Sequence, residues 1–353
     1  MIPEPGFLRL LAGVTWRHRF IHALAFFSLV LAIAVGARTG NLPDMSLVAD
    51  FVDYIAIVFM LAAIVFSLHR IFRMAVIDRD PAPLSTFIRS FIAFFADRNL
   101  IANSLNGLTA LVVFSSAFSV LKGSIAILRP FSWDERLSNL DRVLHFGHAP
   151  YEWPLALLKM PAVIFAINVA YNFWFVILIG AMMTAAIARQ DTKLRHQFLI
   201  SLIVLWIGAG FFVALGFSSA GPAYYARLGL GDDYRPLMDA LYVANSRYDI
   251  WALRTQDLLW QGYVGTTSGS VGISAFPSVH VISAVLFALY ASRQSKVVGN
   301  AFWIFAGIIM VGSVMLGWHY AVDGYAGALI SVLVWKAAGR LLDRDTAQDF
   351  ADA

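Results

Sequence analysis

Long apolar blocks separated by short polar segments set the hydrophobic pattern of the chain. The blocks lack the alternation of a half-buried strand, and most approach the roughly 20 residues that a helix needs to cross a bilayer. The pattern predicts eight membrane-spanning helices, at residues 20–37, 51–69, 104–121, 161–188, 198–217, 280–292, 298–317 and 323–339. The block at 280–292 is short, and a buried or interfacial helix is the alternative there.

Composition narrows the fold class. Of the 353 residues, 59% are hydrophobic and only 14% are charged. A soluble domain of this length needs more charge, so we expect an all-α integral membrane protein with about eight transmembrane helices. The chain has no cysteine, which excludes disulfides, thiolate metal sites and a cysteine nucleophile.

Lysine and arginine residues between the blocks predict the orientation, because cytoplasmic loops carry more of them. With the N-terminus inside, the larger share of the 26 basic residues lies in cytoplasmic segments. We therefore expect a protein of the cell (inner) membrane with both termini in the cytoplasm. The two long outer loops are then 131–160 and 218–279. Aromatic and basic residues at 82–97 predict a helix on the cytoplasmic surface.

Three short polar elements lie where spans are predicted to meet the outer surface. They are K-x6-R-P at 122–130, F-P-S-V-H at 276–280 and H-Y-A-V-D at 319–323. The elements are far apart in sequence, yet the orientation derived from loop charge places all three on one side of the membrane. Each pattern alone is weak, since a basic residue at a span end is usually an interfacial anchor. Their common side makes a shared site the better interpretation.

The residue types in these elements suit a phosphate. Arg129 offers a planar fork for phosphate oxygens, and Lys122 acts as a point charge seven residues earlier, about two helical turns away. Ser278 precedes a predicted helix, where its hydroxyl and the first N–H groups can bind an anion. His319 and Asp323 are four residues apart, so the carboxylate can orient the imidazole. His280 is free to act as a general acid or base on a leaving oxygen.

The three elements resemble the signature of the type 2 phosphatidic acid phosphatase (PAP2) superfamily, which reads K-x6-R-P, P-S-G-H and S-R-x5-H-x3-D. The first motif is complete, but Val279 stands where many members have glycine, and Gly312 and Ser313 stand where they have the S-R pair. In lacking this arginine and in carrying the run GPAYY at 221–225, the chain is similar to the branch that contains inositol phosphorylceramide synthases and sphingomyelin synthases. Those enzymes transfer a phospho-headgroup to a lipid alcohol.

The resemblance implies a domain organisation and roles for the site residues. It implies a six-helix PAP2-like catalytic membrane core at 101–345, an N-terminal two-span extension at 1–100 that includes the interfacial helix, and a tail at 346–353. His319 would be the nucleophile that forms a phosphohistidine, oriented by Asp323. The leaving group would be protonated by His280, and the phosphate would be held by Lys122, Arg129 and Ser278. Candidates for further headgroup contacts are Arg254, Arg247, Tyr224 and Tyr225. The positive charge of the absent arginine could be replaced by one of the loop arginines, Arg227, Arg235, Arg247 and Arg254.

These observations predict a lipid phosphotransferase or phosphatase that cleaves a lipid phosphate ester or phosphodiester at the outer, periplasmic leaflet. The expected partners are a lipid phosphate or phospholipid donor, a lipid alcohol acceptor and the surrounding lipids, with no nucleic acid, metal or cofactor. Transfer is slightly favoured over hydrolysis of phosphatidic acid or a polyprenyl pyrophosphate. A transporter and an inactive scaffold are the alternatives from other classes. Transporters place ionisable residues in mid-span, whereas here they gather at one surface.

Overall fold

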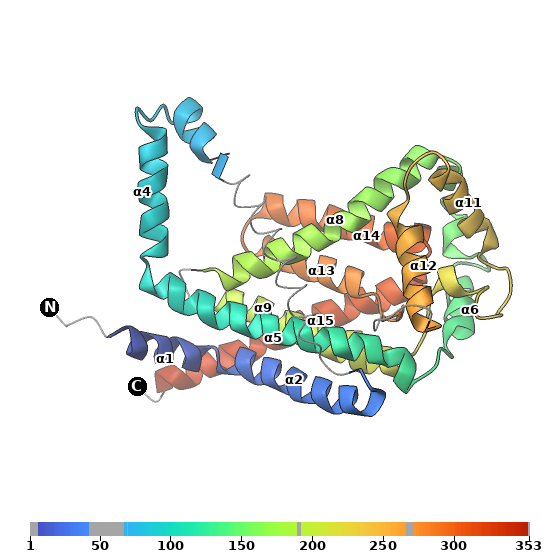
Figure 1. Ribbon diagram of the computed structural model, residues 1–353, viewed down its shortest axis with the longest axis horizontal. Coiled ribbons are helices and arrows are strands. Elements are labelled where there is room, and N and C mark those ends of the chain that lie inside the picture. Colours follow the sequence, from blue (N-terminus) through green and yellow to red (C-terminus); the bar gives the residue numbers. More distant parts are fainter. Residues whose placement is uncertain (1–5, 42–66, 69, 189–191, 266–271, 352–353) are drawn as a thin grey trace.

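The computed structural model describes residues 6–41, 67–68, 70–188, 192–265 and 272–351, and every regular element in these ranges is helical. Long helices form a bundle, and shorter helices cover one end of it (Figure 1). The long helices are α2 (Arg19–Thr39), α5 (Arg98–Leu128), α8 (Pro161–Ala186), α9 (Lys193–Ile207), α13 (Val279–Ser292), α14 (Lys296–Met315) and α15 (Ala321–Ala351). The shorter α-helices are α1 (Phe7–Arg17), α4 (Pro83–Phe95), α6 (Asp134–Leu144), α7 (Leu155–Leu158), α10 (Ala214–Gly216), α11 (Arg235–Asn245) and α12 (Trp251–Tyr263). Single turns of other helix types are η1 (Arg73–Ile77), η2 (Pro150–Glu152), η3 (Gly208–Val213) and η4 (Pro222–Tyr224).

Six helices of the described part are long and apolar enough to cross a membrane, as expected for a multi-pass membrane protein. They are α2, α5, α8, the run from α9 to α10, α14 and α15. The expected span at 51–69 falls almost wholly outside the described residues. The expected span at 280–292 corresponds to α13, which has 14 residues and is shorter than the others. The total of eight therefore stays a prediction.

Helix α13, the shortest of the seven long helices, lies inside the bundle and packs against α9, α14 and α15. Protein surrounds it, so it does not have to match the thickness of the lipid by itself. Gly327 of α15 permits a close approach, because a Cβ there would lie 3.1 Å from the carbonyl oxygen of Ser278. The Ser331 hydroxyl donates to the Ile282 carbonyl at 3.0 Å. These contacts hold the start of α13 beside the start of α15.

The N-terminal helices pack on the core through α5. His22 of α2 contacts the Asn106 side chain at 2.7 Å near one end, and the Thr39 and Ser124 hydroxyls lie 3.1 Å apart near the other. Helices α2 and α5 therefore run in the same direction. A further polar contact joins His18, between α1 and α2, to the buried Arg195 of α9 at 2.6 Å.

Helix α4 stands away from the bundle and runs across the direction of α5 (Figure 1). None of its residues is buried, and its exposed apolar side chains include Leu84, Ile88 and Phe91. This helix occupies the segment 82–97, for which the sequence predicts an interfacial helix. Its side of the membrane stays a prediction.

The opposite end of the bundle is covered by α6, α11 and α12 (Figure 1). These helices come from the two segments predicted as long outer loops, 131–160 and 218–279, so the described parts of both loops are largely ordered as short helices. The junction of α14 and α15 lies at this covered end. The cap therefore borders the region in which the polar elements meet.

Candidate active site

Two histidines that are distant in sequence meet at the covered end of the bundle. His280 lies in the first turn of α13, and His319 lies in the turn between α14 and α15. Their ring centroids are 6.0 Å apart, with an angle of 62° between the planes. The second and third sequence elements therefore form one site.

A backbone carbonyl holds the ring of His319. Its Nδ1 lies 2.8 Å from the carbonyl oxygen of Ala275. A carbonyl can only accept, so Nδ1 carries the proton and Nε2 keeps its lone pair. Burial, and then the charge of Lys122, lower the pKa of His319 to about 3, against the opposing effect of the Ala275 hydrogen bond. His319 is thus a neutral imidazole whose Nε2 can act as a nucleophile.

Asp323 stands behind this histidine. Its Oδ2 lies 3.4 Å from Nδ1 of His319 and accepts the backbone N–H of Tyr320 at 3.0 Å. The expected orienting carboxylate is therefore present, but the Ala275 carbonyl is the nearer acceptor. The carbonyl of Asp323 also accepts the backbone N–H of Ser278 at 3.1 Å, which fastens the second element to the third.

The first element joins the site through Lys122. Its half-buried ammonium donates to the carbonyl of Ser274 at 3.1 Å. Gly272 allows this strand of chain to lie against α5, since a Cβ there would be 2.6 Å from the Lys122 carbonyl oxygen. All three sequence elements are therefore brought together.

The other two residues of the expected phosphate cradle differ in position. Ser278 is fully buried at the N-cap of α13, where its hydroxyl oxygen accepts the N–H of Val281 at 3.4 Å. Arg129 directly follows α5, and its carbonyl accepts the hydroxyl of Ser218 at 2.8 Å. Its side chain is exposed and forms no ion pair with any described residue. Lys122 is the cation whose charge acts on His319.

Aromatic side chains of α8 form a wall beside His280. The ring of Tyr171 stacks on it at 4.6 Å between centroids, and the ring of Trp174 lies 4.3 Å away. Both aromatic residues are buried. The sequence does not single them out, because an aromatic residue inside a membrane span looks like any other core residue.

The four additional candidates lie in the cap. The hydroxyl of Tyr224 donates to the Gln256 carbonyl at 3.2 Å, and Tyr225 is buried. Arg247 is exposed, and Arg254 is exposed beside Asp249 at 4.0 Å. Their contact with a headgroup stays a prediction.

A buried carboxylate on α6 fixes the turn that precedes the cap. Asp134 accepts the backbone N–H groups of Ala220, at 2.9 Å, and Gly221, at 2.8 Å, together with the hydroxyl of Tyr320 at 2.9 Å. Gly221 has a φ of 101°, and a Cβ there would lie 2.5 Å from the carbonyl oxygen of Trp318. The turn at 220–221 therefore lies directly against the residue that precedes His319.

A second carboxylate of α6 caps α15. Asp141 accepts the N–H groups of Ala321, at 2.7 Å, and Val322, at 2.8 Å, which open that helix just after His319. Burial raises the pKa of Asp141 to about 6, although both hydrogen bonds oppose the rise. Asp134 and Asp141 are seven residues apart and share one face of α6, as their burial shows. That polar stripe is the sequence signal for these two positioning residues, which the three motifs do not include.

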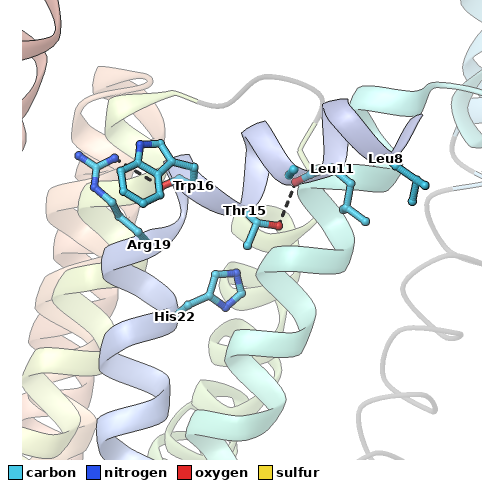
Figure 2. Close-up of a pocket in the computed structure, with 7 residues that line it drawn as sticks. Leu8, Leu11, Thr15, Trp16, Arg19 and His22 are labelled. Carbon is cyan, nitrogen blue, oxygen red and sulfur yellow. Dashed lines mark hydrogen bonds between the residues drawn. The ribbon is translucent and has the colours of Figure 1, made fainter. Parts of the chain in front are cut away.

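A hollow of about 510 Å³ lies elsewhere, along α1 and the start of α2, and its lining includes Trp16, Arg19 and His22 (Figure 2). None of the residues in the three polar elements lines it. Within the described ranges, no group of three or more His, Cys, Asp or Glu side chains could hold a metal ion.

Comparison with known families gives one match. Residues 135–337 match the model of the PAP2 superfamily. A comparison with curated proteins and with solved structures finds no match. The matched region covers more than half of the chain and contains both histidines, Asp323, the aromatic wall and Asp141. The chain therefore belongs to the PAP2 superfamily, whose members include phosphatases and phosphotransferases of lipid-type substrates.

Proposed function

We propose that this protein cleaves a lipid phosphate ester or phosphodiester through a phosphohistidine on His319. The observation that carries the proposal is the neutral imidazole of His319, whose Nδ1 is occupied by Ala275 and whose Nε2 keeps its lone pair beside His280. A neutral nucleophile beside a second histidine and a lysine suits phosphoryl transfer, because little more than positioning and charge stabilisation is required.

The first step forms one bond and breaks one. Nε2 of His319 attacks phosphorus, and the bond from phosphorus to the leaving oxygen breaks. His280, as an imidazolium that the anionic phosphate stabilises, gives its proton to that oxygen and becomes neutral. Lys122 and Ser278 bind the phosphate oxygens, and the exposed side chain of Arg129 adds a second positive charge. Asp323 and the Ala275 carbonyl stabilise the positive charge that develops on the imidazole.

The second step regenerates the enzyme. His280 takes the proton from an attacking hydroxyl, the new phosphorus–oxygen bond forms, and the bond to Nε2 breaks. We propose a lipid alcohol as the preferred acceptor. The scarcity of cations beside the histidines supports this choice, because a phosphodiester carries less negative charge than the monoester that a typical phosphatase binds. Hydrolysis of phosphatidic acid or a polyprenyl pyrophosphate is the alternative. No metal or cofactor is required by either step.

The placement in the membrane belongs to the same proposal. Loop charges favour cytoplasmic termini and a site at the periplasmic leaflet of the cell membrane. The eighth span, the division at residues 100 and 345, and the likeness to the inositol phosphorylceramide synthase branch complete it. The clustering of ionisable residues at one end of the spans speaks against a transporter, and the intact His319–Asp323 pair speaks against an inactive scaffold.

Purified protein tests the proposal with a lipid phosphomonoester and a phosphodiester, each offered with and without a lipid alcohol acceptor that differs from the alcohol leaving the donor. His319→Ala should lose activity on every substrate. His148→Ala is the matched control, because that histidine is exposed and paired with Glu152 in the cap. Product that depends on the acceptor supports transfer, and phosphate released without it supports hydrolysis. Full activity of His319→Ala would refute the mechanism.

A further inference from the structure

Buried polar atoms without a partner gather around the two histidines. Burying a hydroxyl, an indole N–H or a carboxylate oxygen without a hydrogen bond costs free energy, so such atoms are scarce and mark places where a ligand binds. Five of those in the described part of the chain belong to residues that contact the site: Tyr171, Trp174, Ser274, Ser313 and Asp323.

Tyr171 and Ser313 form a pair within this group. The ring of Tyr171 stacks on His280 and rests against α14 at Gly312, where a Cβ would lie 3.0 Å from the ring. Its hydroxyl lies beside that of Ser313. Neither oxygen has a hydrogen bond of good geometry to a described residue, so at least one of the two O–H groups is left without an acceptor. The side chains are 4% and 1% exposed, so solvent does not satisfy either hydroxyl.

Ser313 is also tied to the nucleophile. Its backbone carbonyl accepts the N–H of His319 at 3.1 Å. The Tyr171–Ser313 pair therefore touches both halves of the catalytic pair, His280 through the tyrosine ring and His319 through the serine backbone. The titratable groups near this pair are Lys122, His280, His319 and Asp323.

We infer that the hydroxyls of Tyr171 and Ser313 donate hydrogen bonds to an oxygen of the phosphate that His319 attacks, and so form a neutral part of the phosphate site. This inference rests on the proposed function. A hydroxyl can donate a directional hydrogen bond to a phosphate oxygen without adding positive charge to the site. In a buried site with Lys122 and the carboxyl of Asp323, each extra negative charge on the substrate is poorly compensated. The pair therefore favours a phosphate with one negative charge over a phosphate with two.

Tyr171→Phe is the sharpest variant, because it removes the hydroxyl and keeps the ring that stacks on His280. A lost hydrogen bond to a charged oxygen should lower kcat/KM for a lipid phosphodiester by about 10- to 100-fold. Ser313→Ala should act in the same way. In the double variant, the fold-loss of kcat/KM should be smaller than the product of the two single fold-losses, because both hydroxyls donate to the same oxygen. Tyr151→Phe is the control, because its hydroxyl bonds the Asp233 carbonyl in the cap.

A second arm varies the charge of the substrate. A phosphomonoester takes its second negative charge near pH 6, whereas a phosphodiester keeps one throughout. The ratio of kcat/KM for the diester to that for the monoester should rise about tenfold or more between pH 5 and 8. Titration of His280, His319, Asp323 and Lys122 acts on both substrates and cancels in the ratio. A constant ratio would overturn the neutral site.

The remaining outcomes are equally decisive. If Tyr171→Phe lowers the melting temperature but leaves kcat/KM unchanged, the pair binds a structural water and the inference is wrong. That result leaves the proposed function standing, provided that His319→Ala is inactive. If His319→Ala retains activity, the proposed function fails first.

Discussion

Gly221→Ala tests whether the turn at 220–221 positions the nucleophile. A side chain at this φ of 101° adds about 1–3 kcal/mol of backbone strain. The new Cβ would also lie 2.5 Å from the Trp318 carbonyl oxygen, nearly 1 Å inside ordinary contact, and 3.2 Å from the Ala275 Cβ. Relieving this overlap costs about 1–3 kcal/mol more. It moves both neighbours of His319, the residue before it and the residue whose carbonyl holds its ring.

The expected result is a loss of both stability and rate. The free energy of unfolding should fall by about 2–6 kcal/mol in total. A shift of about 1 Å at the nucleophile should lower kcat about 100-fold. Gly229→Ala is the matched control, because Gly229 has a φ of 74° and a Cβ added there would meet no atom within 4 Å. Thermal unfolding in detergent and steady-state kinetics measure both effects. If Gly221→Ala behaves like Gly229→Ala, the turn does not position His319.

Three further variants address separate parts of the site. His280→Asn should lower kcat about 100- to 10,000-fold on a lipid substrate, but much less on a p-nitrophenyl phosphate ester, because its leaving oxygen needs no proton. An equal loss of kcat on both substrates would show that His280 is not the general acid. Asp134→Ala leaves two buried N–H groups without an acceptor and should destabilise the protein by about 2–5 kcal/mol, seen as a lower melting temperature; an unchanged melting temperature would contradict the role of Asp134. The pKa of His319 in the folded protein, about 3, lies below its unfolded value, so the free energy of unfolding falls as the pH drops from about 6.5 towards 3. Between pH 7 and 5 the wild type should lose about 2 kcal/mol of this free energy relative to His319→Gln. A difference between the two proteins that stays constant with pH would show that His319 is not buried as a neutral base.

The hydrophobic pattern predicts most of the fold. Each of the six long apolar helices corresponds to a block in the sequence, because a lipid-facing helix must be apolar along its whole length. Helix α13 shows the limit of this reasoning. Its length does not report a membrane thickness, since α9, α14 and α15 surround it. A helix of 14 residues looks like a short span in the sequence, although nine of the residues are buried in protein.

The residue types also predict which groups meet, but not how they are held. Spacing within each element leads to His280, His319, Asp323 and Lys122. Spacing cannot reveal that the carbonyl of Ala275 holds the His319 ring, because every residue has a carbonyl and only the fold selects one. The same holds for the aromatic wall of α8. The carboxylates of α6 differ, because their spacing of seven residues is visible in the sequence. The sequence does not show which backbone N–H groups these carboxylates bind.

Site-specific detection of the phosphoenzyme tests the central claim most directly. Wild-type protein is mixed with a lipid substrate labelled on phosphorus, quenched in base, in which phosphohistidine survives, and digested for mass spectrometry and phosphorus NMR. Because Nδ1 is occupied by the Ala275 carbonyl, we expect phosphate on Nε2 of His319, absent from His319→Ala and present in His148→Ala. Turnover with no label on His319, or with label on another residue, would contradict the phosphohistidine mechanism.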